Sequence, residues 1–289
     1  MPELSIIIPS LNEEFLGKTL EDLLSHTGSE TEIICVLDGW KPTYELPKDL
    51  RIKYIHFEKS QGQRRATNLA VKESIAKFVM KTDSHCSFAP NFDTQLLKDI
   101  KDNMVMTALM CRLHAFDWLC SCGKRQYQDH KPESCHEWKK EIIWNIAPKP
   151  FTKRYSFDTN MVFQYEKHQE ETEELVETLA LQGSMFMVSR ENYWKWNLCD
   201  ENFGSWGFQG VETALKCWFN GGTVVTNKNT FYGHMFRTED IPYERTKEQV
   251  EIAHEKARQF LKHPKFPEII RHFDFPQDWS EEKLKELCG

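Results

Sequence analysis

Long apolar runs are what this sequence most plainly lacks. The run from Leu4 to Pro9 is far shorter than the roughly 20 residues that a membrane-spanning helix needs. It also lacks the basic flank and the small-residue cleavage site of a signal peptide. Internal repeats and low-complexity linkers are absent as well. We therefore expect a cytoplasmic protein without a membrane span.

The sequence also lacks the even set of cysteines that a disulfide framework requires, because it contains nine. In a reducing cytoplasm these side chains are expected to be thiols or metal ligands. The net charge of −7 argues against a large nucleic-acid-binding surface, although it leaves room for a local basic patch. The 289 residues, 40% of them apolar and 28% charged, are typical of an ordinary globular domain.

Regular structure is easiest to predict in the N-terminal third. Short β-branched or apolar runs alternate with stretches in which apolar residues recur at helical spacing. The expected strands are residues 4–8, 33–37, 52–57 and 78–82, and the expected helices are residues 16–24 and 64–76. This alternation predicts an α/β fold with a mostly parallel central sheet flanked by helices.

Two acidic residues follow predicted strands. Asp38 comes at the end of the second strand and Asp83 directly after the fourth. Ligands of such sheets bind at the carboxyl ends of the strands, so both are candidate binding residues. For Asp38, which precedes Gly39, a role as a turn former is the alternative.

The remaining sequence is divided by its periodicity. Residues 112–180 show weak periodicity, with an acidic stretch from Glu166 to Glu177 that we predict to be helical and solvated. Apolar order resumes at 184–188, followed by a helix at 211–219, a strand at 223–226 and a charged, helical C-terminal section. We predict a single domain with four parts: residues 1–110, an irregular insertion (111–180), residues 181–242 and a C-terminal helical extension (243–289).

The pair Asp83 and His85 is a candidate metal site. In an extended chain, residues two apart point the same way, so both side chains can reach one ion. A carboxylate oxygen with an imidazole nitrogen suits Mn²⁺ better than Ca²⁺. An ion here would neutralise a leaving diphosphate. A motif this short also arises by chance.

Longer blocks of sequence resemble a known family. The segment Ile6 to Glu13, the aspartate after the second strand and the Asp-x-His motif resemble glycosyltransferases of the GT-A fold. The C-terminal half narrows the resemblance to the catalytic domain of the polypeptide N-acetylgalactosaminyltransferases. The blocks that carry it are 83–86, 183–190, 206–212 and 233–237, in the same order and at similar spacing.

The resemblance implies that residues 1–110 form a nucleotide-binding half and residues 181–242 a donor and acceptor half. It also implies a role for each matching position. Asp83, His85 and His234 would bind Mn²⁺, with Mg²⁺ as the alternative. A UDP-sugar would be the donor, and the residues expected to bind it are Pro9, Ser10, Glu13, Asp38, Arg65, Ser84, Gly183 and Ser184. Trp206 and Arg237 would belong to mobile walls that close over the sugar. Without the resemblance, His234 would be interpreted as an ordinary core or surface histidine.

One position departs from the family pattern. Gln209 stands where the family has a glutamate, and an amide cannot act as a catalytic base. Glu212 is a carboxylate three residues on, but it lies one helical turn away and is aimed differently. We therefore expect a retaining transfer, in which the departing phosphate takes the proton and the protein supplies positioning and charge.

Cysteine and histidine residues crowd the predicted insertion. Cys111, His114, Cys120, Cys122, Cys135 and His136 are candidate ligands of a structural Zn²⁺. Their spacing fits no standard zinc finger, and buried thiols are the commoner outcome.

The sequence indicates less about the acceptor substrate than about the donor. A Ser/Thr hydroxyl, a saccharide or another alcohol would fit, and so would the hydroxymethyl group of a modified DNA base. Residues 123–157 interleave basic with aromatic side chains, which can track phosphates and stack an extruded base. These side chains are Lys124, Arg125, Lys131, Lys139, Lys140, Lys149, Lys153 and Arg154 among Trp138, Trp144, Phe151 and Tyr155. A solvated, ordinarily packed insertion is the simpler interpretation.

Two further classes of function are alternatives. A catalytically impaired protein that binds a nucleotide-sugar is supported by Gln209 and opposed by the complete metal set. A nucleotidyltransferase would be expected to have a basic, glycine-rich loop after the first strand, whereas residues 10–14 are acidic.

Overall fold

The computed structural model describes residues 1–130, 137–166, 172–237, 241–243 and 246–289. Its strands are β1 (Leu4–Ser10), β2 (Thr31–Asp38), β3 (Ile52–Phe57), β4 (Phe78–Thr82), β5 (Cys86–Phe88), β6 (Met104–Cys120), β7 (Arg125–Tyr127), β8 (Trp138–Pro150), β9 (Tyr155–Phe157), β10 (Phe163–Tyr165), β11 (Leu175–Glu177), β12 (Met185–Ser189) and β13 (Thr223–His234). Its helices are α1 (Leu16–His26), α2 (Gln63–Glu73), α3 (Phe92–Asp99), α4 (Arg190–Lys195), α5 (Gln209–Phe219), α6 (Lys247–Gln259), α7 (Phe266–His272) and α8 (Glu281–Cys288), with short 3₁₀ turns at Glu201–Phe203 and Phe260–Lys262.

The central sheet is mixed but mostly parallel. Its strand order is β11-β13-β6-β12-β4-β1-β2-β3. β1 is parallel to β2 and to β4, β2 is parallel to β3, and β13 is parallel to β6. β12 runs antiparallel to both of its neighbours, and β11 runs antiparallel to β13. The other strands along this path therefore share one direction, as the sequence predicted, and their carboxyl ends meet at one edge.

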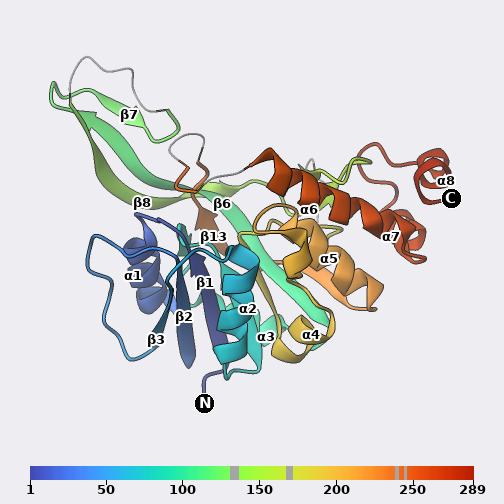
Figure 1. The fold of residues 1–289 in the computed structure, drawn as a ribbon, viewed down its shortest axis with the longest axis horizontal. Coiled ribbons are helices and arrows are strands. Elements are labelled where there is room, and N and C mark those ends of the chain that lie inside the picture. Colours follow the sequence, from blue (N-terminus) through green and yellow to red (C-terminus); the bar gives the residue numbers. More distant parts are fainter. Residues whose placement is uncertain (131–136, 167–171, 238–240, 244–245) are drawn as a thin grey trace.

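Alternating side chains divide the core between the two faces of the sheet. Ile6 and Ile8 pack on one face with α1 and α3, whereas Ile7 packs on the other with α2, α4 and α5. Figure 1 shows helices on both faces of the strands. This pattern explains why β1 is a continuous apolar run, since a strand covered on both sides has no solvent face.

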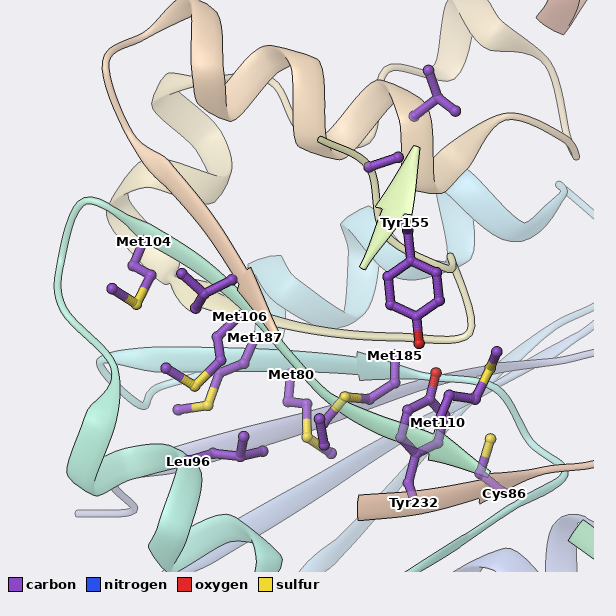
Figure 2. Packing of buried hydrophobic residues seen from close by; sticks show 14 of the residues in the cluster. Met80, Cys86, Leu96, Met104, Met106, Met110, Tyr155, Met185, Met187 and Tyr232 are labelled. Carbon is purple, nitrogen blue, oxygen red and sulfur yellow. The ribbon is translucent and has the colours of Figure 1, made fainter. Parts of the chain in front are cut away.

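Methionine side chains fill much of the first face. Figure 2 shows them in the same cluster as Tyr155 and Tyr232, with Met110 drawn next to the two tyrosines; they are Met80, Met104, Met106, Met110, Met185 and Met187. The flexible thioether chain suits an irregular space of this kind. The C-terminal helices α6, α7 and α8, which the sequence predicted as helical, pack on the same cluster.

Strands β6, β7 and β8 form a long β-ribbon in a region where weak periodicity predicted irregular structure. β6 extends past the central sheet to pair with β7 and β8, and the ribbon projects from the body of the protein (Figure 1). Register shifts near Cys111 and His114 break the alternation of inward and outward side chains, which hid the strands from a periodicity analysis. The predicted boundary at residue 110 therefore falls inside β6.

The helix predicted from Glu166 to Glu177 is wrong in its described part. Leu175–Glu177 forms strand β11, which pairs with β13 at the sheet edge. Residues 167–171 of that prediction lie outside the described residues. Pairing with a neighbouring strand overrides the helical preference of so short an acidic segment. In the described part of the chain, no helix has the length and apolar character needed to cross a membrane.

Candidate active site

The three predicted metal ligands meet at the carboxyl edge of the sheet. Asp83 follows β4, His85 precedes β5, and His234 ends β13. β13 pairs with β5 so that His234 lies opposite Cys86. One potential ligand atom from each of the three residues lies within 4.8 Å of the others. Within the described residues, this is the group of side chains with the composition and spacing of a metal site.

His234 has the properties of a ligand rather than of a packed core histidine. The side chain is buried, and neither ring nitrogen makes a hydrogen bond within the described part of the chain. Its Nε2 lies 3.4 Å from Oδ2 of Asp83, which is longer than a well-formed hydrogen bond. Burial lowers the pKa of His234, so the ring is neutral and can offer a lone pair to a cation. A carboxylate with two imidazoles fits a divalent ion such as Mn²⁺.

Glu13 orients the second imidazole. Its Oε2 lies 3.0 Å from Nδ1 of His85, and its other oxygen accepts from Arg237. A carboxylate on one ring nitrogen fixes the tautomer and leaves the other nitrogen for a metal. Although burial opposes it, the adjacent His85 and Arg237 hold the pKa of Glu13 below its usual value. Glu13 was predicted to bind the donor; it lines the cavity of 490 Å³ described next, and it also supports His85.

Two cavities meet at these ligands. One, of 490 Å³, is lined by the ends of β1 and β2 and the start of α2, and we call it the nucleotide-side cavity. The other, of 390 Å³, is lined by residues 181–184, the start of α5 and the segment after β13, and we call it the sugar-side cavity. Both are lined by Gln63, Asp83, His85, Trp206 and Tyr243. The candidate metal site therefore lies at the junction of two spaces, each large enough for part of a ligand.

The nucleotide-side cavity contains most of the predicted donor-binding residues: Pro9, Ser10, Glu13, Asp38 and Ser84. The hydroxyl of Ser10 is buried and makes no hydrogen bond within the described residues, so it is available to a ligand. Asp38, by contrast, already accepts from the Ser60 hydroxyl at 2.8 Å and from the backbone N–H groups of Gln61 and Gly62 at 2.6 and 2.9 Å. Its carboxylate thus holds the loop before α2 against the cavity.

The sugar-side cavity is lined by Gly183, Ser184, Trp206, Gln209 and Arg237, all of them candidate site residues of the sequence analysis. Gln209 opens α5, and its Oε1 accepts from Gln63 at 3.2 Å. The Ser184 hydroxyl contacts the hydroxyl of Tyr232 at 2.7 Å, so it is occupied within the protein. A side chain at Gly183 would come within 3.3 Å of Gln209, and glycine keeps this wall open.

The structure does not bring Glu212 or Arg65 to the cavities. Glu212 is fully buried and accepts from Arg64 at 2.9 and 3.1 Å and from Lys216 at 2.7 Å. Glu212 lies one helical turn after Gln209 on α5, and its side chain points into the protein. This position does not support the expected catalytic role of Glu212. Arg65 is exposed on α2, because the neighbouring Arg64 is on the side of the helix that faces the protein interior.

The cysteine and histidine residues of the insertion do not assemble in the described part of the chain. His114 pairs with Asp117 at 2.7 Å, and Cys111 is buried. The Sγ atoms of Cys120 and Cys122 lie 3.1 Å apart. Cys135 and His136, like the basic residue Lys131, lie outside the described residues. A structural Zn²⁺ in this region, which the sequence analysis gave only as an alternative to buried thiols, thus stays untested.

Several residues of the site were missed at the level of sequence. Gln63 and Tyr243 line both cavities, and Gln249 of α6 lines the nucleotide side. Lys81 is buried on β4 and contacts Asp83. Only Lys81 left a signal, since a lysine inside the apolar run 78–82 needs a partner. The other three carry no motif.

Comparisons with known proteins show which family this sequence resembles. The model of the glycosyl transferase family 2 matches residues 5–159. Polypeptide N-acetylgalactosaminyltransferase 12 of Mus musculus is 20% identical over 264 residues, which cover 86% of this chain and 42% of that protein. Polypeptide N-acetylgalactosaminyltransferase 5 of Caenorhabditis elegans is 21% identical over 255 residues, which cover 82% of this chain and 37% of that protein. The chain thus spans less than half the length of these two relatives.

Solved structures show the same fold. The crystal structure of GalNAc-T7 with UDP, GalNAc and Mn²⁺ superimposes with a TM-score of 0.70 at 16% identity, covering 98% of this chain and 53% of that one. The crystal structure of TarS from S. aureus gives a TM-score of 0.52 at 12% identity, covering 99% of this chain and 42% of that one. The GT-A-like α/β fold expected from the sequence is confirmed, and the chain belongs to glycosyl transferase family 2.

Proposed function

We propose that this protein is a metal-dependent glycosyltransferase that moves a hexose or N-acetylhexosamine from a UDP-sugar to a hydroxyl acceptor. The observation that carries the proposal is the cluster of Asp83, His85 and His234, in which Asp83 and His85 line both cavities and His234 lines the sugar-side cavity. A diphosphate bridging the cavities would lie over these ligands. The similarity to a structure that contains UDP, GalNAc and Mn²⁺ supports this class of donor.

Each described side chain has a distinct task in this arrangement. Asp83, His85 and His234 would hold a divalent ion, which when bound supplies positive charge for the leaving diphosphate. Glu13 keeps His85 in one tautomer. The N-terminus of α5, with Gln209 on its first turn, points its partial positive charge at the sugar-side cavity. Trp206, which lines both cavities, lies where sugar and nucleotide would meet.

We further propose that the transfer retains the anomeric configuration. Among the described residues that line the sugar-side cavity, Asp83 is the only carboxylate, and it is already paired with Lys81. Gln209 cannot take a proton. An inverting reaction needs a carboxylate base on the acceptor side, whereas a retaining one can pass the proton to the departing phosphate. An NMR time course that shows a product of the opposite configuration to the donor would overturn this part of the proposal.

The lining of the sugar-side cavity favours a neutral acceptor. Its apolar and aromatic side chains include Val162, Phe163, Phe208, Met235 and Phe236. Arg237 is the only arginine or lysine among its described lining residues, and it is paired with Glu13. Two basic residues of the ribbon are engaged as well, since Arg125 pairs with Asp117 and Lys140 pairs with Glu14. A saccharide or a hydroxyl-bearing side chain therefore fits better than DNA.

The experiment that tests the proposal is UDP release from a panel of UDP-sugars with and without Mn²⁺. We expect release with at least one donor, loss of release after chelation, and loss in the Asp83→Ala variant. Asp99→Ala, which removes a carboxylate on α3 that contacts Asn227, is a control. If the protein binds UDP but releases it from none of the donors, a nucleotide-sugar-binding protein would be the better interpretation.

A further inference from the structure

Lys81 is a cation buried directly beneath the candidate metal site. Its side chain is 1% exposed and lies on β4, between β1 and β12 in the centre of the sheet. Lysine is rarely buried without a partner. Its ammonium donates to Oδ1 of Asp83 and, at 2.7 Å, to the carbonyl oxygen of Gly183. Residues two apart on a strand point the same way, which is why Lys81 reaches the same carboxylate as the ion would.

The two carboxylate oxygens of Asp83 therefore have different neighbours. Oδ1 is occupied by Lys81, whereas Oδ2 faces His234 at 3.4 Å. The contact with Lys81 thus orients the carboxylate of Asp83 before any ion arrives.

The fixed charges around the three ligands cancel. Lys81 contacts Asp83, and Arg237 contacts Glu13, which in turn contacts His85. Arg237 also lies 3.6 Å from Glu14, which pairs with Lys140. These are three cations and three carboxylates, while His85 and His234 bind metal only as neutral rings. A divalent ion would enter a site with no net negative charge and with an ammonium on one of its ligands. Coulomb repulsion from that ammonium is only weakly screened in a buried site.

We propose that Lys81 acts as an internal counter-cation that makes metal binding depend on the nucleotide. It stabilises Asp83 while the site holds no ion, and it weakens the affinity for an ion that arrives alone. A nucleoside diphosphate supplies the missing negative charge at the junction of the cavities, so ion and nucleotide bind cooperatively. Because binding coupling is reciprocal, each tightens the other by the same factor. This inference rests on the proposed UDP-sugar donor.

The test is a titration of Mn²⁺, with free Mn²⁺ measured by electron paramagnetic resonance, in the absence and presence of UDP. For the unaltered protein we expect UDP to tighten Mn²⁺ binding at least about tenfold. Lys81→Met removes the charge and keeps an unbranched apolar chain. We expect this variant to bind Mn²⁺ alone about tenfold more tightly, and to show a smaller effect of UDP. Lys77→Met, which removes a lysine charge whose side chain is 65% exposed, should behave like the unaltered protein.

The outcomes separate this inference from the proposed function. If the unaltered protein with UDP binds no Mn²⁺, the proposed metal-dependent function fails, and this inference fails with it. If Mn²⁺ binds equally well with and without UDP, the counter-cation role alone is overturned. The same holds if Lys81→Met melts like the unaltered protein and binds Mn²⁺ alone no more tightly. The absence of a UDP effect on the unaltered protein overturns the role without any variant, whereas its presence supports the role only together with tighter Mn²⁺ binding by the variant. Where Lys81→Met does not fold, Lys81→Gln is the second variant, because it also removes the charge but keeps a donor for the Gly183 carbonyl; equal Mn²⁺ affinity of a folded Lys81→Gln variant and the unaltered protein would overturn the role.

Discussion

The imidazole of His85 and the carboxylate of Glu13 face each other across 72 positions of sequence, with 3.0 Å between Nδ1 and Oε2. The contact joins the loop after β1 to the loop after β4. It leaves Nε2 of His85 as the atom that can bind an ion. The contact between these loops thus prepares one ligand of the candidate metal site in advance.

Replacing Glu13 by Gln should weaken Mn²⁺ binding in the presence of UDP by about 10- to 100-fold, because the carboxylate that orients His85 is lost. Calorimetric titration measures the change. Glu14→Gln, at a neighbouring and more exposed carboxylate, should shift the affinity much less. Equal affinities for the Glu13→Gln variant and the unaltered protein would show that His85 needs no such support.

Gln209 should contribute positioning rather than proton transfer. We expect Gln209→Ala to lower the rate of sugar transfer by about tenfold or less while leaving the product configuration unchanged. Asp83→Ala should abolish transfer, because it removes a ligand. Steady-state kinetics with NMR identification of the anomer measures both. A loss with Gln209→Ala as complete as with Asp83→Ala would contradict a positioning role.

Glu212 should matter for stability. Its removal leaves the Arg64 guanidinium, which is 1% exposed, without its carboxylate, and breaking a buried pair costs about 3–5 kcal/mol. Glu212→Ala should therefore lower the free energy of unfolding by roughly this amount in urea titrations. Glu251→Ala, on the exposed side of α6, is the control. A Glu212→Ala variant of normal stability that cannot transfer sugar would restore the catalytic interpretation.

The metal-free protein should lose stability on acidification through His234. Burial lowers the pKa of His234 in the folded state, so the unfolded chain binds the proton more readily. Stability then rises with pH across this window and falls progressively as the pH drops below about 6.5, the ordinary pKa of histidine. We expect the melting temperature in chelator to fall between about pH 7.5 and 5.5, and to fall less in His234→Phe. An equal fall in both proteins would assign the effect to other groups.

Sequence reasoning was most successful where a pattern is local. The β-branched run at Leu4–Ser10 and the aspartates after β2 and β4 followed from periodicity and chain order. Asp83 and His85 followed from the geometry of an extended chain. His234 came from family resemblance alone, because pairing of β13 with β5 is a long-range contact that no local pattern reveals.

The misses share a physical cause. Which of the neighbours Arg64 and Arg65 faces inward depends on how α2 sits on the sheet, and the buried partner Glu212 is 148 positions away. The extent of β6 was hidden by its register shifts. Properties that depend on packing between distant segments are not encoded in short stretches of sequence.

The central claim is that Asp83, His85 and His234 hold one divalent ion beside the nucleotide. Crystals grown with UDP and Mn²⁺ allow a direct measurement, the anomalous difference density of manganese. The account predicts one peak in contact with all three side chains and with the diphosphate. A manganese peak elsewhere in a UDP-bound crystal, or a peak that His234 does not touch, would contradict it.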